Sequence, residues 1–307
     1  MPEKEHIPDK SIERINGAMI THAREIATEI NATAVLAYVD AIQSERNLES
    51  LIKESRCILA ARNQDVIDNL IKMKEEAHRI IPVPYMELTR LSQIKVAVMV
   101  ALSSNLIQYG DLLVCLSGSS IYGILDNLMV MEVGREFEIF SSKSLEIKDQ
   151  MDPPHVFARL LTIAMELSEE GKEGKPIGTI FVLGDHHKVM ELSSQMIINP
   201  FSGVPENDRN ILNPDLKETI REFATIDGAF IVRKDGVIVA AGRHLKSSAE
   251  DSELPQGLGA RHRAALGITA LTDALAVTIS ESNGDVRVFS RGKIFMEIEK
   301  RRKTESY

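Results

Sequence analysis

An acidic residue followed by two small residues is the first group in the sequence that could do chemistry. Asp227 precedes Gly228 and Ala229, at a point where a helix is expected to give way to a strand. The small residues leave open space beside the carboxylate, which could then bind a divalent metal ion or accept a proton from a substrate hydroxyl. An aspartate in an ordinary turn before a hairpin has the same local sequence, so both interpretations stay open at this point.

A glycine-rich segment that leads into basic residues is the second such group. It places cationic side chains at the expected start of a helix, and its members are Gly257, Gly259, Ala260, Arg261, His262 and Arg263. Backbone N–H groups at a helix start and charge-assisted side-chain donors both suit phosphate oxygens. The segment is neither a Walker loop nor a dinucleotide-binding fingerprint. A phosphate site is the favoured interpretation, and a solvated basic surface loop is the alternative.

Two further segments carry polar side chains of interest. Ser280 and Glu281 end an expected strand, and strand ends are where sites gather in α/β sheets. Glu281 would add a second carboxylate near Asp227, which would suit divalent metal and phosphate chemistry, although a glutamate before a turn is commonly just solvated. His186 and His187 are adjacent, and without further ligands at a fitting spacing they are weak evidence for a zinc site.

The overall charge and hydropathy restrict the class of protein. The 307 residues include 36 Lys and Arg against 45 Asp and Glu, a formal net charge of −9. This balance argues against a nucleic-acid partner or an anionic membrane surface. Apolar runs fall far short of the roughly 20 residues of a membrane helix, and the N-terminus lacks a signal-peptide core, so we expect a cytoplasmic protein. Cys57 and Cys115 lie in apolar runs and should be buried free thiols rather than a disulfide.

The first half of the chain alternates between helices and strands. Apolar periodicity predicts helices over 13–30, 45–54, 64–73 and 91–108. Short apolar runs predict strands over 34–39, 57–60, 80–83, 112–116 and 128–133. This alternation is typical of a mostly parallel sheet with helices on its faces. Ser117–Ser120 could hold an anion after the fourth strand or form an ordinary polar turn.

The second half mixes hairpins with helices. A polar, proline-containing stretch over 141–152 predicts a boundary between domains of residues 1–145 and 146–307. Helices are expected over 153–170, 215–224 and 261–274. Strands are expected over 177–183, 230–232, 237–239, 275–280 and 286–289. The turn sequences at 234–236 and 283–284 predict hairpins. The fold class is therefore α/β, with a mostly parallel first sheet and a mixed second sheet flanked by helices.

The motifs of the second half resemble those of a diadenylate cyclase (DAC) domain. Asp227-Gly228-Ala229 and Arg261-His262-Arg263 match that family's two defining motifs in order and spacing. The resemblance extends over 153–295, and its other matching segments are 178–185, 199–201, 241–243, 254–255 and 280–281. The first half is similar to the C-terminal domain of pyruvate kinase at 29–31 and 110–111. Together the two halves resemble the archaeal type of diadenylate cyclase.

This resemblance implies an enzyme that condenses two ATP molecules into cyclic di-AMP and two pyrophosphates with Mn²⁺ or Mg²⁺. Two such domains face each other with one ATP in each, which implies an even-numbered homo-oligomer. Asp227 would activate or position the ribose 3′-hydroxyl, and Asp227 and Glu281 would help to hold the metal. The remaining implied nucleotide contacts are Gly228, Ala229, Leu245 against the adenine, the backbone of 257–260, Arg261, His262, Arg263 and Ser280.

One departure and two alternatives accompany the resemblance. Many family members have Thr where this chain has Ala260, and a lost hydrogen bond to a charged group costs about 1.5–3 kcal/mol. That departure bears on affinity or metal preference more than on the reaction class. The alternative function is a regulatory protein that binds ATP or cyclic di-AMP without turnover, although Asp227 favours an enzyme. The first domain is expected to be an oligomerisation scaffold, with an allosteric sensor as the alternative.

Overall fold

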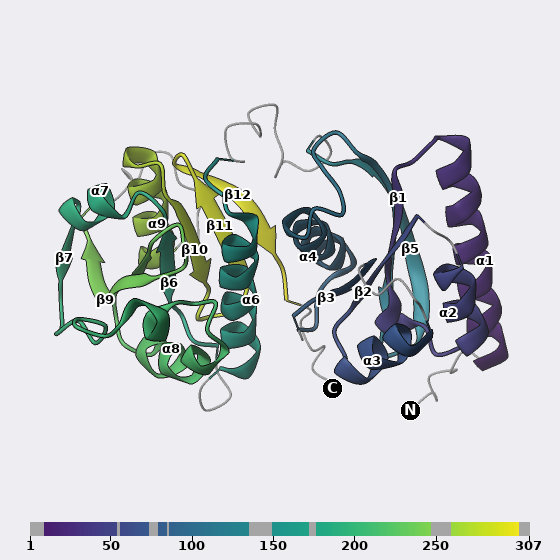
Figure 1. Ribbon diagram of the computed structural model, residues 1–307, viewed down its shortest axis with the longest axis horizontal. Coiled ribbons are helices and arrows are strands. Elements are labelled where there is room, and N and C mark those ends of the chain that lie inside the picture. Colours follow the sequence, from purple (N-terminus) through teal and green to yellow (C-terminus); the bar gives the residue numbers. More distant parts are fainter. Residues whose placement is uncertain are drawn as a thin grey trace, which may run out of the picture. The chain divides into compact units, whose positions relative to one another are not determined.

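The computed structural model describes residues 9–53, 56–73, 79–84, 86–134, 149–171, 176–246 and 259–300. The chain forms two compact units, Met1–Glu136 and Phe137–Tyr307, each with its own sheet (Figure 1). The domain boundary expected at 145/146 falls within 135–148, which lies outside the described residues, and it stays a prediction. None of the described helices is long and apolar enough to cross a membrane.

The sheet of the N-terminal unit has five strands in the order β3-β2-β1-β4-β5. Its strands are β1 (Ala34–Tyr38), β2 (Cys57–Ala61), β3 (Ile80–Pro82), β4 (Leu112–Ser119) and β5 (Ile124–Glu132). The first four run parallel, whereas β5 pairs antiparallel with β4. The prediction of a mostly parallel sheet is confirmed, and β5 begins earlier than expected because it forms a hairpin with β4 directly.

Helices cover both faces of this sheet. They are α1 (Asp9–Glu29), η1 (Val39–Ala41), α2 (Glu45–Ile52), α3 (Gln64–Met73) and α4 (Arg90–Ser103). Side chains of α1, α2 and α3 share one core cluster with alternate residues of β1 and β2, while α4 lies on the opposite face (Figure 1). β1 and β2 are consequently buried at every position, which explains why they appear in the sequence as continuous apolar runs.

Both cysteines belong to this unit, are buried and form no disulfide, as predicted. Burial raises the pKa of the Cys115 thiol to about 12, because the interior disfavours the thiolate. Cys57 belongs to the core cluster beneath the helices. These thiols are packing residues rather than reactive nucleophiles.

The sheet of the C-terminal unit has seven strands in the order β12-β11-β10-β6-β8-β9-β7. The strands are β6 (Ile180–Leu183), β7 (Ser193–Gln195), β8 (Ala229–Val232), β9 (Ile238–Leu245), β10 (Leu275–Ile279), β11 (Val286–Ser290) and β12 (Lys293–Ile298). β6 and β8 pair in parallel, and the other neighbours are antiparallel, so the predicted mixed sheet is confirmed. The sequence did not predict the two edge strands β7 and β12.

The helical elements of this unit are α6 (Pro154–Glu170), α7 (His186–Glu191), η4 (Glu206–Arg209), η5 (Pro214–Leu216), α8 (Lys217–Ala224) and α9 (Ala260–Leu271). Leu266 and Ile268 of α9 pack into one core cluster with Val182 of β6. Phe181 and Phe230 point to the other face, where their rings stack 4.9 Å apart. Packing of α9 on the sheet fixes the position of its N-terminus beside the strand ends.

Candidate functional site

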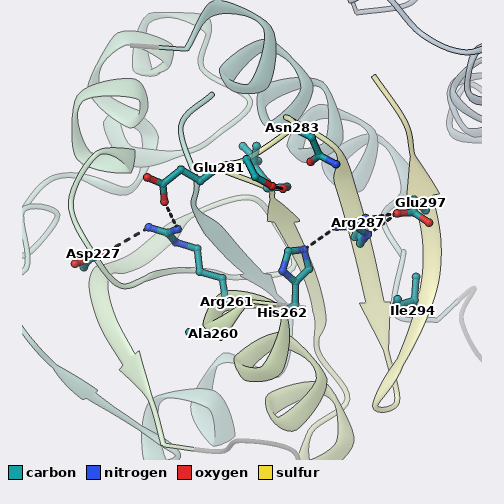
Figure 2. Close-up of a pocket in the computed structure, with 13 residues that line it drawn as sticks. Asp227, Ala260, Arg261, His262, Glu281, Asn283, Arg287, Ile294 and Glu297 are labelled. Atoms are coloured by element: carbon teal, nitrogen blue, oxygen red, sulfur yellow. Dashed lines mark hydrogen bonds and ion pairs between the residues drawn. The ribbon is translucent and has the colours of Figure 1, made fainter. Parts of the chain in front are cut away.

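The candidate site forms at one edge of the C-terminal sheet, where two strands begin and another ends. The register places Ile180 of β6 between Ala229, the first residue of β8, and Thr278 near the end of β10. Asp227 precedes β8 and Glu281 follows β10, so the two carboxylates reach the same edge although they are distant in the sequence. Figure 2 shows the start of α9 at this edge as well.

Arg261, the second residue of α9, joins the two carboxylates. Its Nη1 donates to Oε2 of Glu281 at 2.8 Å, and its Nη2 lies 3.4 Å from Oδ1 of Asp227 (Figure 2). The side chains of Asp227 and Glu281 are 82% and 68% exposed. Solvent screening makes such exposed ion pairs weak, so a triphosphate can take over the donors of Arg261 at little cost.

A cavity of about 810 Å³ opens at this arginine. Its described lining residues come from the start of α9 and from the strands beside it: Asp227, Gly259, Ala260, Arg261, His262, Ile279, Ser280, Glu281, Ser282, Asn283, Arg287, Ile294 and Glu297. Ser280 is buried, and its hydroxyl lies 3.0 Å from that of Ser282. The structure therefore brings together Asp227, Arg261, His262, Ser280 and Glu281, as the sequence motifs suggested.

A smaller recess of about 250 Å³ adjoins the same carboxylate. It shares Asp227, Ala260 and Arg261 with the larger cavity and adds Gly228, Ala229 and Leu245 from β8 and β9. Leu245 is buried at the end of β9 and offers an apolar wall. The two openings meet at Asp227, one apolar and the other rich in polar side chains.

His262 differs from the charged phosphate donor that the sequence suggested. The residue is buried, its ring packs edge-on against Phe289, and its Nε2 lies 3.0 Å from Nη1 of Arg287. Arginine can only donate, so Nε2 accepts and the proton of the neutral ring is on Nδ1. Burial, followed by the positive charge of Arg287, lowers the pKa of His262 to about 4. At neutral pH His262 is therefore an uncharged donor.

We expect His262 to make the stability of the protein depend on pH between about 6.5 and about 4. In that range the unfolded chain binds a proton that the folded chain does not, so stability falls as pH falls. Because the ring borders an open cavity, the loss of unfolding free energy should be about 1–2 kcal/mol, which is less than the pKa shift alone would give. Urea unfolding of the wild type and of His262→Gln at several pH values in this range measures how the unfolding free energy depends on pH. An equally steep dependence in both proteins would contradict the assignment.

Arg287 of β11 is a cavity residue that the sequence analysis missed. Besides His262 it contacts Glu297 of β12, and Asp285 lies 3.7 Å from its Nη2. A lone arginine in the apolar run 286–290 was the available signal. Its place beside His262 depends on antiparallel pairing with β10, where Arg287 opposes Thr278, and sequence periodicity does not contain that register.

Two of the sequence-predicted residues are not assigned to the cavities. Gly257 lies outside the described residues. Arg263 is half-buried and is not among the described residues that line either opening. Since successive helical residues are about 100° apart, Arg263 points well away from Arg261. The three-residue basic motif thus splits, with Arg261 and His262 facing the cavity.

The carboxylates at the cavity supply part of the ligand set that a divalent cation needs. Among the described residues no three His, Cys, Asp or Glu side chains are grouped so that they could hold a metal ion, including those around His186 and His187. Asp227 and Glu281 do supply two carboxylates at one cavity. Mg²⁺ is commonly held by one or two carboxylates together with substrate phosphates and water. These residues fit a cation that binds together with a triphosphate.

Gly178, just before β6, lies against the arginine and makes a direct test of its placement. A Cβ atom at this position would lie 2.6 Å from Nη1 of Arg261 and 2.8 Å from Cβ of Glu281. Gly178→Ala should push the guanidinium away from Glu281. For the ATP-dependent reaction that the motif resemblance implies, kcat/KM should fall about 10- to 100-fold, because small misplacements of charged groups are costly in catalysis. Steady-state kinetics measures this effect.

Thermal unfolding of Gly178→Ala serves as the control. The atoms in the way belong to side chains, and one is the far end of a flexible arginine, so the fold should persist with a small change in Tm. Wild-type kinetics in a folded Gly178→Ala protein would show that the position of Arg261 is unimportant.

Two family models match the chain. The model described as DisA bacterial checkpoint controller nucleotide-binding covers residues 167–294, and the model described as probable sensor domain DacZ_P covers residues 16–140. Both motifs that form the site lie within the first match.

Curated relatives match over most of the chain. A diadenylate cyclase of Methanocaldococcus jannaschii is 33% identical over 92% of this chain and 96% of its own. A diadenylate cyclase of Haloferax volcanii is 32% identical over 73% of this chain and 81% of its own. The cyclic di-AMP synthase CdaA of Bacillus subtilis is 40% identical over 24% of this chain and 26% of its own.

Proposed function

This chain belongs to the diadenylate cyclase family, and from that premise we propose that it joins two ATP molecules into cyclic di-AMP at the cavity around Arg261. The observation that carries the proposal is the meeting of Asp227 and Glu281 at one guanidinium, at a helix start that borders a cavity of about 810 Å³. Carboxylates beside side chains that donate hydrogen bonds to phosphate suit nucleotidyl transfer. In that reaction, positioning and charge neutralisation supply most of the catalysis.

The reaction is two identical substitutions at phosphorus. The ribose 3′-oxygen of one ATP forms a bond to the α-phosphorus of the other, and the bond from that phosphorus to the β-bridging oxygen breaks. Pyrophosphate leaves with the bonding electrons, and the second substitution closes the ring. Asp227, which borders both openings, accepts the hydroxyl proton or orients the hydroxyl for attack.

Arg261 and His262 act on the phosphates. The guanidinium of Arg261 exchanges its carboxylate partners for phosphate oxygens and balances the charge that develops during transfer. His262, uncharged and oriented by Arg287, donates from Nδ1, and Ser280 adds a hydroxyl donor at the same wall. Arg263, outside the lining of both openings, is assigned no direct role.

Asp227 and Glu281 would hold Mn²⁺ or Mg²⁺ once a triphosphate occupies Arg261. The cation, when bound, supplies further charge neutralisation at the phosphates. The chain's own contribution is to present two carboxylates that Arg261 releases when it binds phosphate.

The small recess accommodates the nucleoside. Leu245 offers an apolar surface to the adenine, and Gly228 and Ala229 leave room for the ribose beside Asp227. Because the triphosphate would lie along the larger cavity, the α-phosphate comes close to the strongly exposed carboxylates. The exposure of Asp227 and Glu281 favours a second copy of the chain facing this site, with one ATP in each, in an even-numbered homo-oligomer.

Product analysis tests the function. The purified chain with ATP and either Mn²⁺ or Mg²⁺ should form cyclic di-AMP and pyrophosphate in a 1:2 ratio, and its solution mass should correspond to an even number of subunits. ATP binding without product across several divalent metals would favour the alternative, a regulatory protein that binds nucleotide without turnover. The cytoplasmic location and the lack of a nucleic-acid or membrane partner stay predictions from the sequence.

A further inference from the structure

Polar side chains gather in the N-terminal unit at the carboxyl ends of its parallel strands. The order β3-β2-β1-β4-β5 means that the chain leaves β1 toward β2 and later returns to the other side of β1 as β4. Such a reversal leaves a crevice outside the strand ends, where ligands of open α/β sheets bind. Its residues belong to the N-terminal unit and have no part in the mechanism above.

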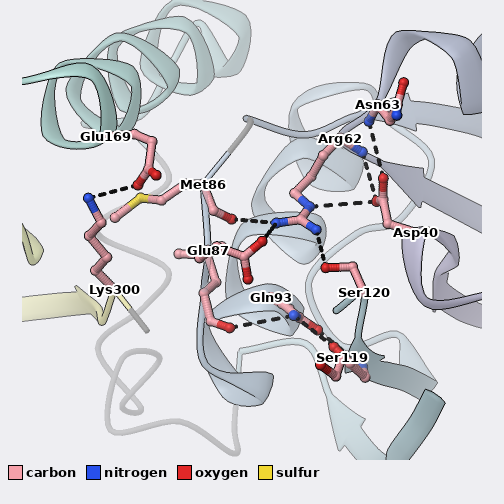
Figure 3. Close-up of polar contacts among 12 residues, drawn as sticks. Asp40, Arg62, Asn63, Met86, Glu87, Gln93, Ser119, Ser120, Glu169 and Lys300 are labelled. Carbon is pink, nitrogen blue, oxygen red and sulfur yellow. Dashed lines mark hydrogen bonds and ion pairs between the residues drawn. The ribbon is translucent and has the colours of Figure 1, made fainter. Parts of the chain in front are cut away.

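Arg62 is the centre of this group (Figure 3). Its side chain is only 5% exposed, and Nη1 donates to the carbonyl oxygen of Met86 and to Oε1 of Glu87, both at 3.0 Å. Its Nη2 donates to the hydroxyl of Ser120 at 2.6 Å. Asp40, also buried, accepts a hydrogen bond from the backbone N–H of Arg62 at 2.9 Å. Segments after four different strands therefore meet at one buried guanidinium.

Glu87 covers this guanidinium from outside. Its carboxylate is 33% exposed, whereas that of Asp40 is 7% exposed and supplies a buried counter-charge for Arg62. Glu87 follows the short edge strand β3 rather than belonging to the sheet. Moving this carboxylate aside would open Arg62 to solvent and leave the buried pair with Asp40 intact. In this structure the carboxylate of Glu87 therefore occupies the position at Arg62 that an anionic ligand would take. Because Glu87 is partly exposed, a ligand could displace it.

Tyr38 supplies an independent sign that this place is built for a further group. The residue is 2% exposed, its ring centroid lies 5.9 Å from Cζ of Arg62, and its hydroxyl has no hydrogen-bond partner among the described residues. Burial raises the pKa of Tyr38, so the hydroxyl keeps its proton and can donate a hydrogen bond. Buried hydroxyls almost always have partners, so this donor fits an acceptor that arrives with a ligand.

The serine run that the sequence analysis singled out contributes less than expected. Ser117 accepts from the amide of Asn127, and Gly118 pairs through its backbone with the side chain of Gln93. Ser120 is the member that reaches Arg62. The run is mostly structural, with one hydroxyl turned to the guanidinium.

We infer that Arg62, Ser120 and Tyr38 form a site for the carboxylate or phosphate group of a small molecule, with Glu87 occupying the place of that group until the ligand displaces it. Arg62 would bind the oxyanion through its fork, and the two hydroxyls would complete the donor set. Asp40 would keep the guanidinium oriented.

The test measures binding of inorganic phosphate and of acetate to the full chain by calorimetry, in chloride buffers of matched ionic strength. Glu87→Gln removes the competing charge with little change of shape and should tighten binding of the preferred anion about tenfold. Ser120→Ala should weaken it about tenfold through loss of one charge-assisted donor. Glu49→Gln, at an exposed pair with Lys53 in the same unit, is the matched control and should bind as wild type does.

Arg261→Ala separates this site from the cyclase cavity, because anion binding at Arg62 should persist in that variant. If Glu87→Gln raises the affinity for acetate alone, the ligand carries a carboxylate. If it raises the affinity for phosphate alone, the ligand carries a phosphate group. The inference is overturned if folded Glu87→Gln binds neither anion, if Glu49→Gln tightens binding equally, or if Arg261→Ala abolishes it. None of these outcomes bears on whether the chain synthesises cyclic di-AMP.

Discussion

Asp227→Asn is expected to lower the rate of cyclic di-AMP synthesis about 10²- to 10⁴-fold, the range associated with loss of a general base. The amide has the shape of the carboxylate but neither its charge nor its proton affinity. It can still meet Arg261 yet cannot accept the proton of a ribose hydroxyl. Product formation from ATP with Mn²⁺ or Mg²⁺, followed by chromatography, gives the rate directly.

ATP binding distinguishes a catalytic loss from a binding loss in this variant. Arg261, His262 and Ser280 remain, and a negative charge beside the phosphates has been removed, so the dissociation constant of metal-free ATP, measured with EDTA present, should stay the same or decrease. Asp208→Asn, the same change at an exposed residue of η4, is the matched control and should retain wild-type synthesis. Turnover at the wild-type rate in Asp227→Asn would refute the role assigned to this carboxylate.

Gly228→Ala is expected to have the largest effect on stability. The backbone of Gly228 has a φ of +114°, a conformation that residues with a Cβ atom rarely adopt. A Cβ atom there would also lie 2.6 Å from the carbonyl carbon of Gly242 and 2.7 Å from the backbone nitrogen of Arg243. These atoms belong to β9, so the β8–β9 pair would have to separate at the residue next to Asp227.

The combined strain should lower the free energy of unfolding by on the order of 3 kcal/mol. For a unit of this size that corresponds to a fall of roughly 6–12 °C in Tm. Calorimetry of Gly228→Ala measures the change, and synthesis should fall with it because Asp227 loses its position. Gly259→Ala is the matched stability control. Its Cβ atom would meet no heavy atom within 4 Å, so it should cost less than about 1 kcal/mol. Equal Tm values for the two variants would contradict this account.

The local features of the fold could be predicted because they depend on nearby residues. Continuous apolar runs such as 57–61 come from strands buried on both faces. The turn at 234–236 contains Gly236 at a φ of +92°, a conformation that few residues other than glycine adopt. The edge strands β7 and β12 were missed because their pairing partners lie elsewhere in the chain and their own residues are partly exposed. Strand pairing is set by contacts that periodicity does not encode.

The sequence by itself determined which chemical groups this protein brings to a nucleotide, since the acidic and basic motifs are defined by residue type and short spacing. Tertiary structure decided which of them meet. Register across β6, β8 and β10 places Asp227 and Glu281 on one arginine, and helix rotation turns Arg263 away from it. Burial beside Arg287 makes His262 neutral, and four strand ends enclose Arg62. Charge and proton affinity depend on neighbours in space, and those neighbours come from segments far apart in the chain.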